Sequence, residues 1–212
     1  MKYKITFLLD KSNDQIKKQL INYNFKLSHK YIFKITNNIN SIKNQNIIFP
    51  LNYTKILSKS FLLKNNLVLI IHSSQLPKDR GFAPIQNQIL KDKNRIYISL
   101  MKAIDKVDAG PIYFQNSFML NGTELSDKIK YIQGRQMIKI IKKFLVKYPN
   151  VKSRKQIGKS NFNKRRNPKD SQLDINKTIK QQFNNLRIND NKLYPSFFHF
   201  KGKKYIIKIF DE

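Results

Sequence analysis

The residue types best suited to chemistry in this chain gather around one histidine. His72 follows the apolar run "LVLII" and opens the loop "SSQLPKDRG". Asp108 lies in a tight "DAG" turn between two other apolar runs, and Asn52 follows a further one. A histidine titrates near pH ~6.5, so it can exchange a proton at neutral pH, and an acidic neighbour would orient its ring and favour its charged form. If the three side chains converge, they form a site for proton transfer. The residues alone leave open a half-buried structural histidine bonded to the backbone.

Apolar runs of strand length, rich in Ile, Phe, Tyr and Val, surround these residues. Several lack clean alternation, which is typical of strands covered on both faces. Polar segments with helical periodicity separate some of them, so we expect an α/β sheet that is parallel at least in its first half. Ligands bind beyond the carboxyl ends of parallel strands, which is where His72 and Asn52 would lie. The expected strands are "YKITFLLD", "KYIFKI", "NIIFPL", "LVLIIH", "RIYISLMKAI" and "PIYFQNSFML".

Helical patterns are expected at three places in the first part of the chain. Residues 12–25 have Ser12 or Asn13 as the cap, residues 53–63 are a shorter candidate, and residues 123–149 form the longest pattern. The longest helix should open with Thr123 and Glu124 and stop at Pro149.

The composition changes at residue 150. Residues 150–172 are basic and without periodicity, which predicts an ordered loop or a linker. A helix capped by Asp174 and a hairpin turning at Lys201 and Gly202 are expected beyond it. We therefore divide the chain into a catalytic domain, residues 1–149, and a substrate-side extension, residues 150–212.

The charge balance makes anionic partners reasonable. The 212 residues carry 42 Lys and Arg against 13 Asp and Glu, a formal charge of +29. Phosphates, nucleic acid or a membrane surface would all fit, although the accompanying Ile and Asn also indicate an AT-rich coding bias. The lack of cysteine excludes disulfides and thiolate metal sites, and three scattered histidines argue against a metal centre. We expect a cytoplasmic protein without a membrane span.

The region around His72 resembles the folate-dependent formyltransferases, the family that includes methionyl-tRNA and sugar-nucleotide formyltransferases. That family carries Ser-x-Leu-Pro-x-x-Arg-Gly and Ala-Pro-Ile-Gln after its histidine, and an Asp-x-Gly turn further on. Spacing and order both fit over roughly residues 45–145. The matching residues are His72, Ser74, Leu76, Pro77, Arg80, Gly81, Ala83, Pro84, Ile85, Gln86, Asp108 and Gly110.

The resemblance implies a Rossmann-like α/β domain with a mostly parallel central sheet and a short C-terminal helix-and-hairpin extension. It implies an enzyme that moves the formyl group of 10-formyltetrahydrofolate to an amine, with His72 and Asp108 as catalytic residues and no metal. Asp108 as a plain turn residue is the alternative. The formyl donor is expected at Leu51, Tyr53, Asp105, Lys106 and Val107, and the amine substrate at Ser74, Lys78, Arg80, Gly81, Pro84 and Arg187. Lys78 and Arg80 could also belong to a solvated basic loop.

One position departs from the family. The family keeps an asparagine two residues before its histidine, where it helps to bind the formyl oxygen, and this chain has Ile70. Either activity is impaired or another amide substitutes. Our candidate is Asn52, for which an ordinary turn residue is an equal alternative.

The last third resembles sugar-nucleotide formyltransferases, with Arg166, Pro168, Asp170, Arg187, Tyr194, Pro195 and Phe198 as the matches. The first expectation is therefore an amino sugar linked to a nucleotide, for surface glycan synthesis, with a homodimer through this segment by analogy alone. Nucleic acid is a less favoured partner, because the form acting on tRNA carries a further domain and only about sixty residues follow Pro149 here. The alternatives are methionyl-tRNA formylation and a catalytically silent relative that binds folate or a nucleotide.

Overall fold

A six-stranded mixed sheet is the centre of the molecule in the computed structural model, which describes residues 2–10, 13–23 and 30–212. The strand order is β2-β1-β3-β4-β6-β7. The first four strands run parallel, and β4 pairs antiparallel with β6, which pairs antiparallel with β7. All six expected strands and the parallel first half are confirmed. The strands are β1 (Tyr3–Leu9), β2 (Tyr31–Thr36), β3 (Ile47–Leu51), β4 (Leu67–His72), β6 (Arg95–Lys102) and β7 (Ile112–Met119).

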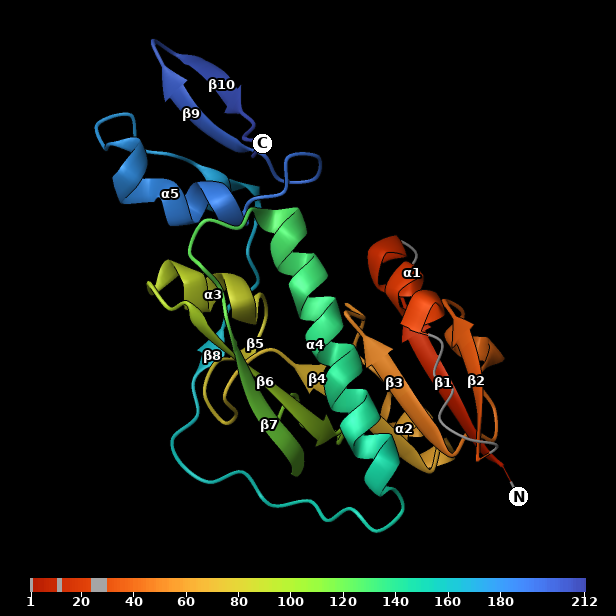
Figure 1. Ribbon diagram of the computed structural model, residues 1–212. Helices are drawn as coiled ribbons and strands as arrows, with labels where there is room; N and C mark the ends of the chain where they lie inside the picture. Colours follow the sequence, from red (N-terminus) through yellow and green to blue (C-terminus); the bar gives the residue numbers. More distant parts are fainter. Residues whose placement is uncertain (1, 11–12, 24–29) are drawn as a thin grey trace.

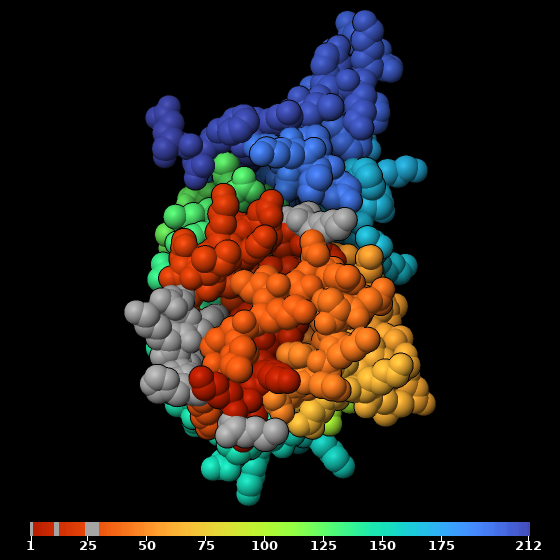
Figure 2. All heavy atoms as spheres, turned by 90° about the vertical axis from the view of Figure 1, so that its right-hand side faces the viewer, coloured from red at the N-terminus to blue at the C-terminus, as the bar shows by residue number. Residues whose placement is uncertain are grey.

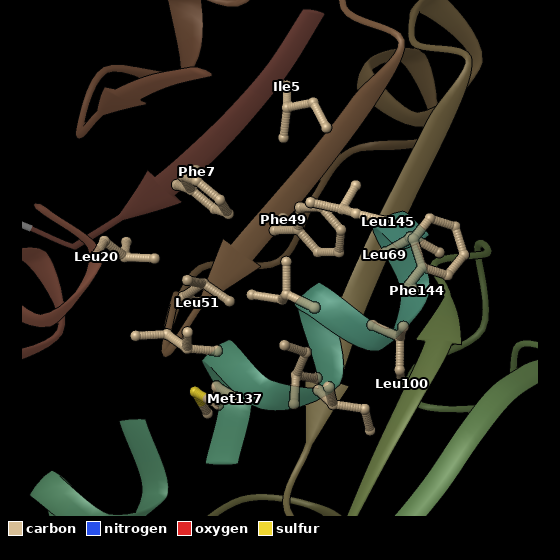
Figure 3. Close-up of a cluster of buried hydrophobic side chains, with 14 of the residues drawn as sticks. Ile5, Phe7, Leu20, Phe49, Leu51, Leu69, Leu100, Met137, Phe144 and Leu145 are labelled. Atoms are coloured by element: carbon tan, nitrogen blue, oxygen red, sulfur yellow. The ribbon is translucent and has the colours of Figure 1, made fainter. Parts of the chain in front are cut away.

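The sheet is covered on both faces, which explains the unbroken apolar runs. On one face, α4 (Ser126–Lys147) lies across the strands beside α1 (Asp14–Tyr23), as Figure 1 shows. Phe144 of α4 packs there against Phe49 with the ring centres 6.2 Å apart, in the cluster of Figure 3. On the other face, Leu8, Ile48 and Val68 pack with residues of α2 (Lys59–Lys64).

Two of the expected helices differ at their boundaries. α4 begins at Ser126 because the side chain of Glu124 instead accepts hydrogen bonds from the backbone N–H groups of Asn121 and Gly122. α2 covers only the second half of its predicted range, because Ser58 caps it by accepting from the N–H of Phe61. Of the two caps expected for α1, Ser12 lies outside the described residues.

A short helix that the sequence did not predict follows the histidine loop. α3 (Pro84–Leu90) has a proline at its first position, where the missing N–H is not needed for an intrahelical bond. Ala83, with φ of 46°, turns the chain into this helix from β5 (Arg80–Gly81). At seven residues, α3 is too short to show a helical period in the sequence.

The C-terminal extension packs against the sheet domain rather than hanging from it. β8 (Phe162–Asn163) pairs in parallel with β5, and Arg154 forms a bridge with Ile112. A 3-10 turn, η2 (Pro168–Ser171), and α5 (Ile179–Ile188) follow. A second 3-10 turn, η1 (Ile39–Ser41), lies between β2 and β3.

The expected terminal hairpin is confirmed, as β9 (Ser196–Phe200) and β10 (Lys203–Ile207). Lys201 and Gly202 have positive φ angles in its two-residue turn, and the hairpin projects from the body in Figures 1 and 2. The predicted cap of α5 is wrong. Thr178 caps the helix, whereas Asp174 accepts from the N–H of Asn176 in a turn that precedes it.

Candidate active site

A cavity of about 500 Å³ lies beside the carboxyl end of β4, where Ile70, Ile71 and His72 line it. One group of lining residues comes from the chain after β3 and from the loop after β6, and includes Tyr53 and Val107. A second group comes from the connection between β5 and α3, from α4, and from the chain after β8. The cavity therefore lies at the strand of the sheet where pairing changes from parallel to antiparallel, a place where α/β proteins bind ligands.

His72 is almost buried and contacts two loops through its two ring nitrogens. Nε2 lies 2.8 Å from the backbone carbonyl oxygen of Asp79, and Nδ1 lies 3.5 Å from Oδ2 of Asp108. A carbonyl oxygen only accepts, so Nε2 is the nitrogen that carries a proton. The structure thus brings the two expected catalytic side chains together, with Nδ1 facing the carboxylate.

The carbonyl of Asp79 is held in place by contacts from two distant segments. Asp79 has φ of 54°, and its N–H donates to Oδ1 of Asn161 over 2.9 Å. Its carboxylate accepts from Nζ of Lys91 at 2.8 Å and from Nδ2 of Asn161 at 3.0 Å. Burial opposes ionisation of Asp79, but these hydrogen bonds outweigh it and lower the pKa of the carboxyl below its ordinary value. The charged carboxylate thus anchors the histidine loop to Lys91 and Asn161.

Asp108 is fixed by both its side chain and its backbone. Its Oδ2 accepts the N–H of Gly81 over 2.9 Å, and its carbonyl accepts from Nε2 of Gln156 over 2.9 Å. The Oε1 of Gln156 accepts from the guanidinium of Arg80 at 2.7 Å. A side chain at Gly110 would begin 1.7 Å from the carbonyl oxygen of Lys102, so only glycine allows the loop to approach β6 this closely.

Amide side chains lie near the histidine on a second wall. Gln133 of α4 donates through Nε2 to Oγ of Ser73 at 2.9 Å and to Oδ1 of Asn52 at 3.4 Å. Asn52 has φ of 46°, and its carbonyl accepts from Asn13 at 3.0 Å. In the side chain of Asn52, the amide oxygen Oδ1 thus accepts from Gln133 and the NH₂ group makes no bond to it. Ile70 also lines the cavity, so the position where the family keeps an asparagine presents hydrocarbon.

The expected site residues divide into those that line the cavity and those that do not. Lining the cavity are His72, Asp108, Asn52, Tyr53, Asp105, Lys106, Val107, Gly81 and Pro84. Leu51 is buried in the main core, and Ser74 donates through Oγ to the carbonyl of Lys78, whose side chain is exposed. Arg80 is directed to Gln156. None of these four residues lines the cavity, so their contacts with a ligand stay a prediction.

The position of Arg187 does not fit the substrate contact that was expected for it. Its side chain is 1% exposed, and it does not line the cavity. Nε donates to Oδ1 of Asn184 over 2.7 Å, and the guanidinium lies 3.7 Å from the carboxylate of Glu124. The buried guanidinium and its partly buried partners therefore form a structural ion pair between Arg187 and Glu124.

Several residues of the site have no signal in the local sequence. Gln133, Phe82 and Arg165 line the cavity, while Gln156 and Asn161 hold its loops. Phe82 directly follows the histidine loop, but nothing in the pattern distinguished it. Among the described residues, no three acidic, cysteine or histidine side chains cluster as a metal site would require. Within the same residues, none of the helices has the length and apolar character needed to span a bilayer.

Comparisons with known proteins agree with this geometry. Residues 6–138 match the formyl transferase family. Methionyl-tRNA formyltransferase from Fusobacterium nucleatum is 31% identical over 96% of this chain and 69% of its own length. The structure of methionyl-tRNA formyltransferase from Clostridium thermocellum superposes with a TM-score of 0.85 at 20% identity, over 98% of this chain and 92% of that one. A sugar N-formyltransferase from Shewanella sp. superposes with a TM-score of 0.75 at 15% identity, over 99% and 98%. This chain therefore belongs to the formyl transferase family, one-carbon transferases whose formyl donor is 10-formyltetrahydrofolate.

Proposed function

We propose that this protein transfers the formyl group of 10-formyltetrahydrofolate to the amino group of methionyl-tRNA. The observation that carries the reaction type is the His72–Asp108 pair on the wall of a cavity of about 500 Å³. The substrate is supported by the sequence similarity to a methionyl-tRNA formyltransferase along 96% of the chain. Similarity over nearly the whole length includes the C-terminal extension, where substrate specificity is expected.

The chemistry needs a group that moves a proton. The neutral amine attacks the formyl carbon, a C–N bond forms, and the tetrahedral intermediate breaks its bond to N10 of the folate. The amine loses a proton, and N10 gains one. Because Nε2 of His72 is held by the carbonyl of Asp79, Nδ1 is the ring nitrogen that accepts and returns this proton. Asp108 stabilises the charged imidazole that forms in between.

The oxygen of the formyl group develops negative charge and needs a hydrogen-bond donor. Ile70 cannot supply one, but the amide of Asn52 lines the same cavity. Since the Oδ1 of Asn52 accepts from Gln133, its NH₂ end is left to donate to the formyl oxygen. Gln133 is thus a positioning residue for Asn52.

The donor is assigned to the wall formed by Tyr53, Asp105, Lys106 and Val107, as the resemblance to the family implies. Apolar side chains that suit a flat heterocycle lie on the same wall, among them Leu57, Leu62 and Ile104. We assign the amine substrate to the other wall, which is formed by residues 81–86 and by residues of α4.

The charge of the protein suits a polyanionic substrate. The formal charge is +29, and the cavity itself is lined by Lys55, Lys102, Lys106, Lys130 and Arg165 against Asp105 and Asp108. Positive surface charge attracts RNA through its phosphates and makes binding depend on salt.

The test is formylation of methionyl-tRNA by the purified protein with 10-formyltetrahydrofolate, with His72→Ala as the control. We expect formyl-methionyl-tRNA to accumulate, KM to rise steeply with salt, and the control to be inactive. Failure to formylate methionyl-tRNA at low salt, with a folded protein, contradicts the proposal.

A second candidate is an amino sugar linked to a nucleotide, the substrate that the sequence favoured. The superposition on a sugar N-formyltransferase over 99% of this chain supports it. We place it second because Arg187, one of the seven C-terminal matches on which it rested, is a buried ion-pair partner and does not line the cavity. Comparing kcat/KM for methionyl-tRNA with kcat/KM for nucleotide-linked amino sugars decides between the two.

A further inference from the structure

A phenylalanine and an arginine form an exposed pair on the wall assigned to the amine substrate. Phe82 precedes α3, is 41% exposed and lines the cavity. The guanidinium carbon of Arg165 lies 5.6 Å from the centre of the Phe82 ring, and Arg165 lines the cavity too. The two residues come from different segments, so the fold rather than the local sequence creates the pair.

The backbone beneath the pair is held by β5 and β8. The N–H of Phe82 donates to the carbonyl of Asn163 over 3.1 Å. A side chain at Gly81 would begin 2.5 Å from that same carbonyl and 2.5 Å from the ring of Phe162, so the two strands are in tight contact. Ala83 then turns the chain away with φ of 46°. Phe82 is therefore presented from a fixed backbone at the cavity.

The positive charge of Arg165 is free to bind a ligand. Of the other basic residues on the cavity wall, Lys130 is paired with Asp127 and Asp190. Arg165 is exposed and has no acidic partner among the residues that the structure describes. A planar guanidinium of this kind can stack on a ring and also bind a phosphate through its N–H groups.

We propose that Phe82 and Arg165 form the binding site for the nucleotide that carries the reactive amine. The base stacks on the surface formed by the ring and the guanidinium, and the phosphate binds the N–H groups of Arg165. Aromatic rings and arginine planes are the two surfaces on which proteins stack unpaired bases. The site lies on the cavity that His72 lines, as a nucleotide next to the reacting amine requires.

This inference rests on the proposed function, because both candidate substrates join an amine to a nucleotide. In one the nucleotide is the 3′-terminal adenosine of a tRNA, and in the other it is the nucleoside diphosphate of a sugar. The chemistry that the pair recognises, a planar base with a phosphate beside it, is the same.

The kinetic test compares Phe82→Leu and Arg165→Lys with matched controls. Leucine keeps an apolar side chain without the ring, and lysine keeps the charge without the plane. Phe210→Leu and Lys164→Ala change an exposed aromatic and an exposed charge, neither of which lines the cavity. We expect both test variants to raise KM for methionyl-tRNA about tenfold, with kcat and the KM of the formyl donor unchanged. Equal KM values in test and control variants overturn the proposal.

A binding test separates this proposal from the proposed function. The probes are the trinucleotide CCA and uridine diphosphate, titrated into the wild-type protein and the four variants with NMR as the readout. Binding that Phe82→Leu abolishes supports the nucleotide site even if no amine is formylated, and binding that it leaves intact overturns the site even if formylation proceeds. Preference for CCA identifies the end of a tRNA as the source, and preference for uridine diphosphate identifies a nucleotide-linked sugar.

Discussion

His72 donates a hydrogen bond of 2.8 Å from its ring nitrogen Nε2 to the backbone carbonyl of Asp79. Because that oxygen can only accept, the neutral ring has its proton on Nε2 and its lone pair on Nδ1, beside the carboxylate of Asp108. The tautomer of the proposed catalytic base is thus set by a loop residue and not by the acidic partner.

Removing either member of the proposed catalytic pair, His72 and Asp108, should lower the rate without unfolding the protein. We expect His72→Ala to reduce kcat by about 10²–10⁴-fold, the usual contribution of a positioned acid or base. Asp108→Asn should cost less, since an amide oxygen can still accept from Gly81 but no longer stabilises a charged ring. Steady-state kinetics with circular dichroism checks both. A variant at position 72 that keeps wild-type kcat would contradict the proton-transfer role.

Removing the hydrogen bonds that hold Asp79 should change the tautomer of His72 indirectly, through the carbonyl of Asp79. Asn161→Ala removes two hydrogen bonds to Asp79, so we expect the Nδ1–H tautomer of His72 to become populated and kcat to fall. Lys159→Ala, an exposed change two residues away, is the control. Nitrogen-15 shifts of the imidazole measure the tautomer directly. Unchanged shifts in Asn161→Ala would show that the anchor does not set it.

The anchor should also make stability depend on pH. The pKa of Asp79 is lower in the folded chain than the ~3.9 of an unfolded aspartate, so its contribution is complete above that pH and is lost as the pH falls through the folded-state value. We expect Asp79→Asn to cost about 1–2 kcal/mol near neutral pH and less in acid. Urea unfolding at several pH values measures it. A difference that grows as the pH falls would have the wrong sign.

The proposal that Asn52 replaces the missing family asparagine can be tested by exchanging the residues at positions 52 and 70. Asn52→Ala should lower kcat by about 10²–10³-fold if its NH₂ group donates to the formyl oxygen. Ile70→Asn in the same variant should restore part of the rate, because residue 70 lines the same cavity. Gln133→Leu should give a smaller loss. Rescue that occurs equally with Ile70→Leu would exclude a hydrogen-bonding explanation.

Arg187 should matter for stability and not for substrate. Arg187→Met leaves the carboxylate of Glu124 without its buried partner, which costs about 3–5 kcal/mol and lowers Tm by about 10 °C. KM for the amine substrate should stay at the wild-type value below the new Tm. Calorimetry and kinetics together check this. A raised KM with an unchanged Tm would restore the role that the sequence suggested.

The sequence predicted the parts of the molecule that depend on neighbouring residues. The six strands follow from runs of Ile, Phe and Val, and the hairpin turn follows from Lys201 and Gly202, because both signals are local. His72 and Asp108 were found through a motif whose spacing fits a known family. Arg187 was assigned to substrate through the resemblance of the last third to sugar-nucleotide formyltransferases. The pattern could not show its ion pair, because Glu124 is sixty-three positions away in the chain.

The residues that hold the site in place could not be predicted either, because their partners are also distant in the sequence. Nothing near Asn161 or Gln156 indicates that one would hold the histidine loop and the other Asp108. The segment that contains them has no periodicity, so its hydrogen bonds depend on side chains that only the folded chain brings together.

The pairing of β8 with β5 has a consequence for how small a working enzyme of this design can be. Our sequence-based boundary placed the catalytic domain before residue 150, yet Gln156 and Asn161 hold the loops of Asp108 and Asp79 from beyond it. A fragment that ended at residue 149 would keep every strand of the central sheet and the histidine itself, but the two loops would lose their hydrogen bonds with Gln156 and Asn161. We therefore expect the smallest catalytic unit that can be transplanted or expressed alone to extend past Asn163.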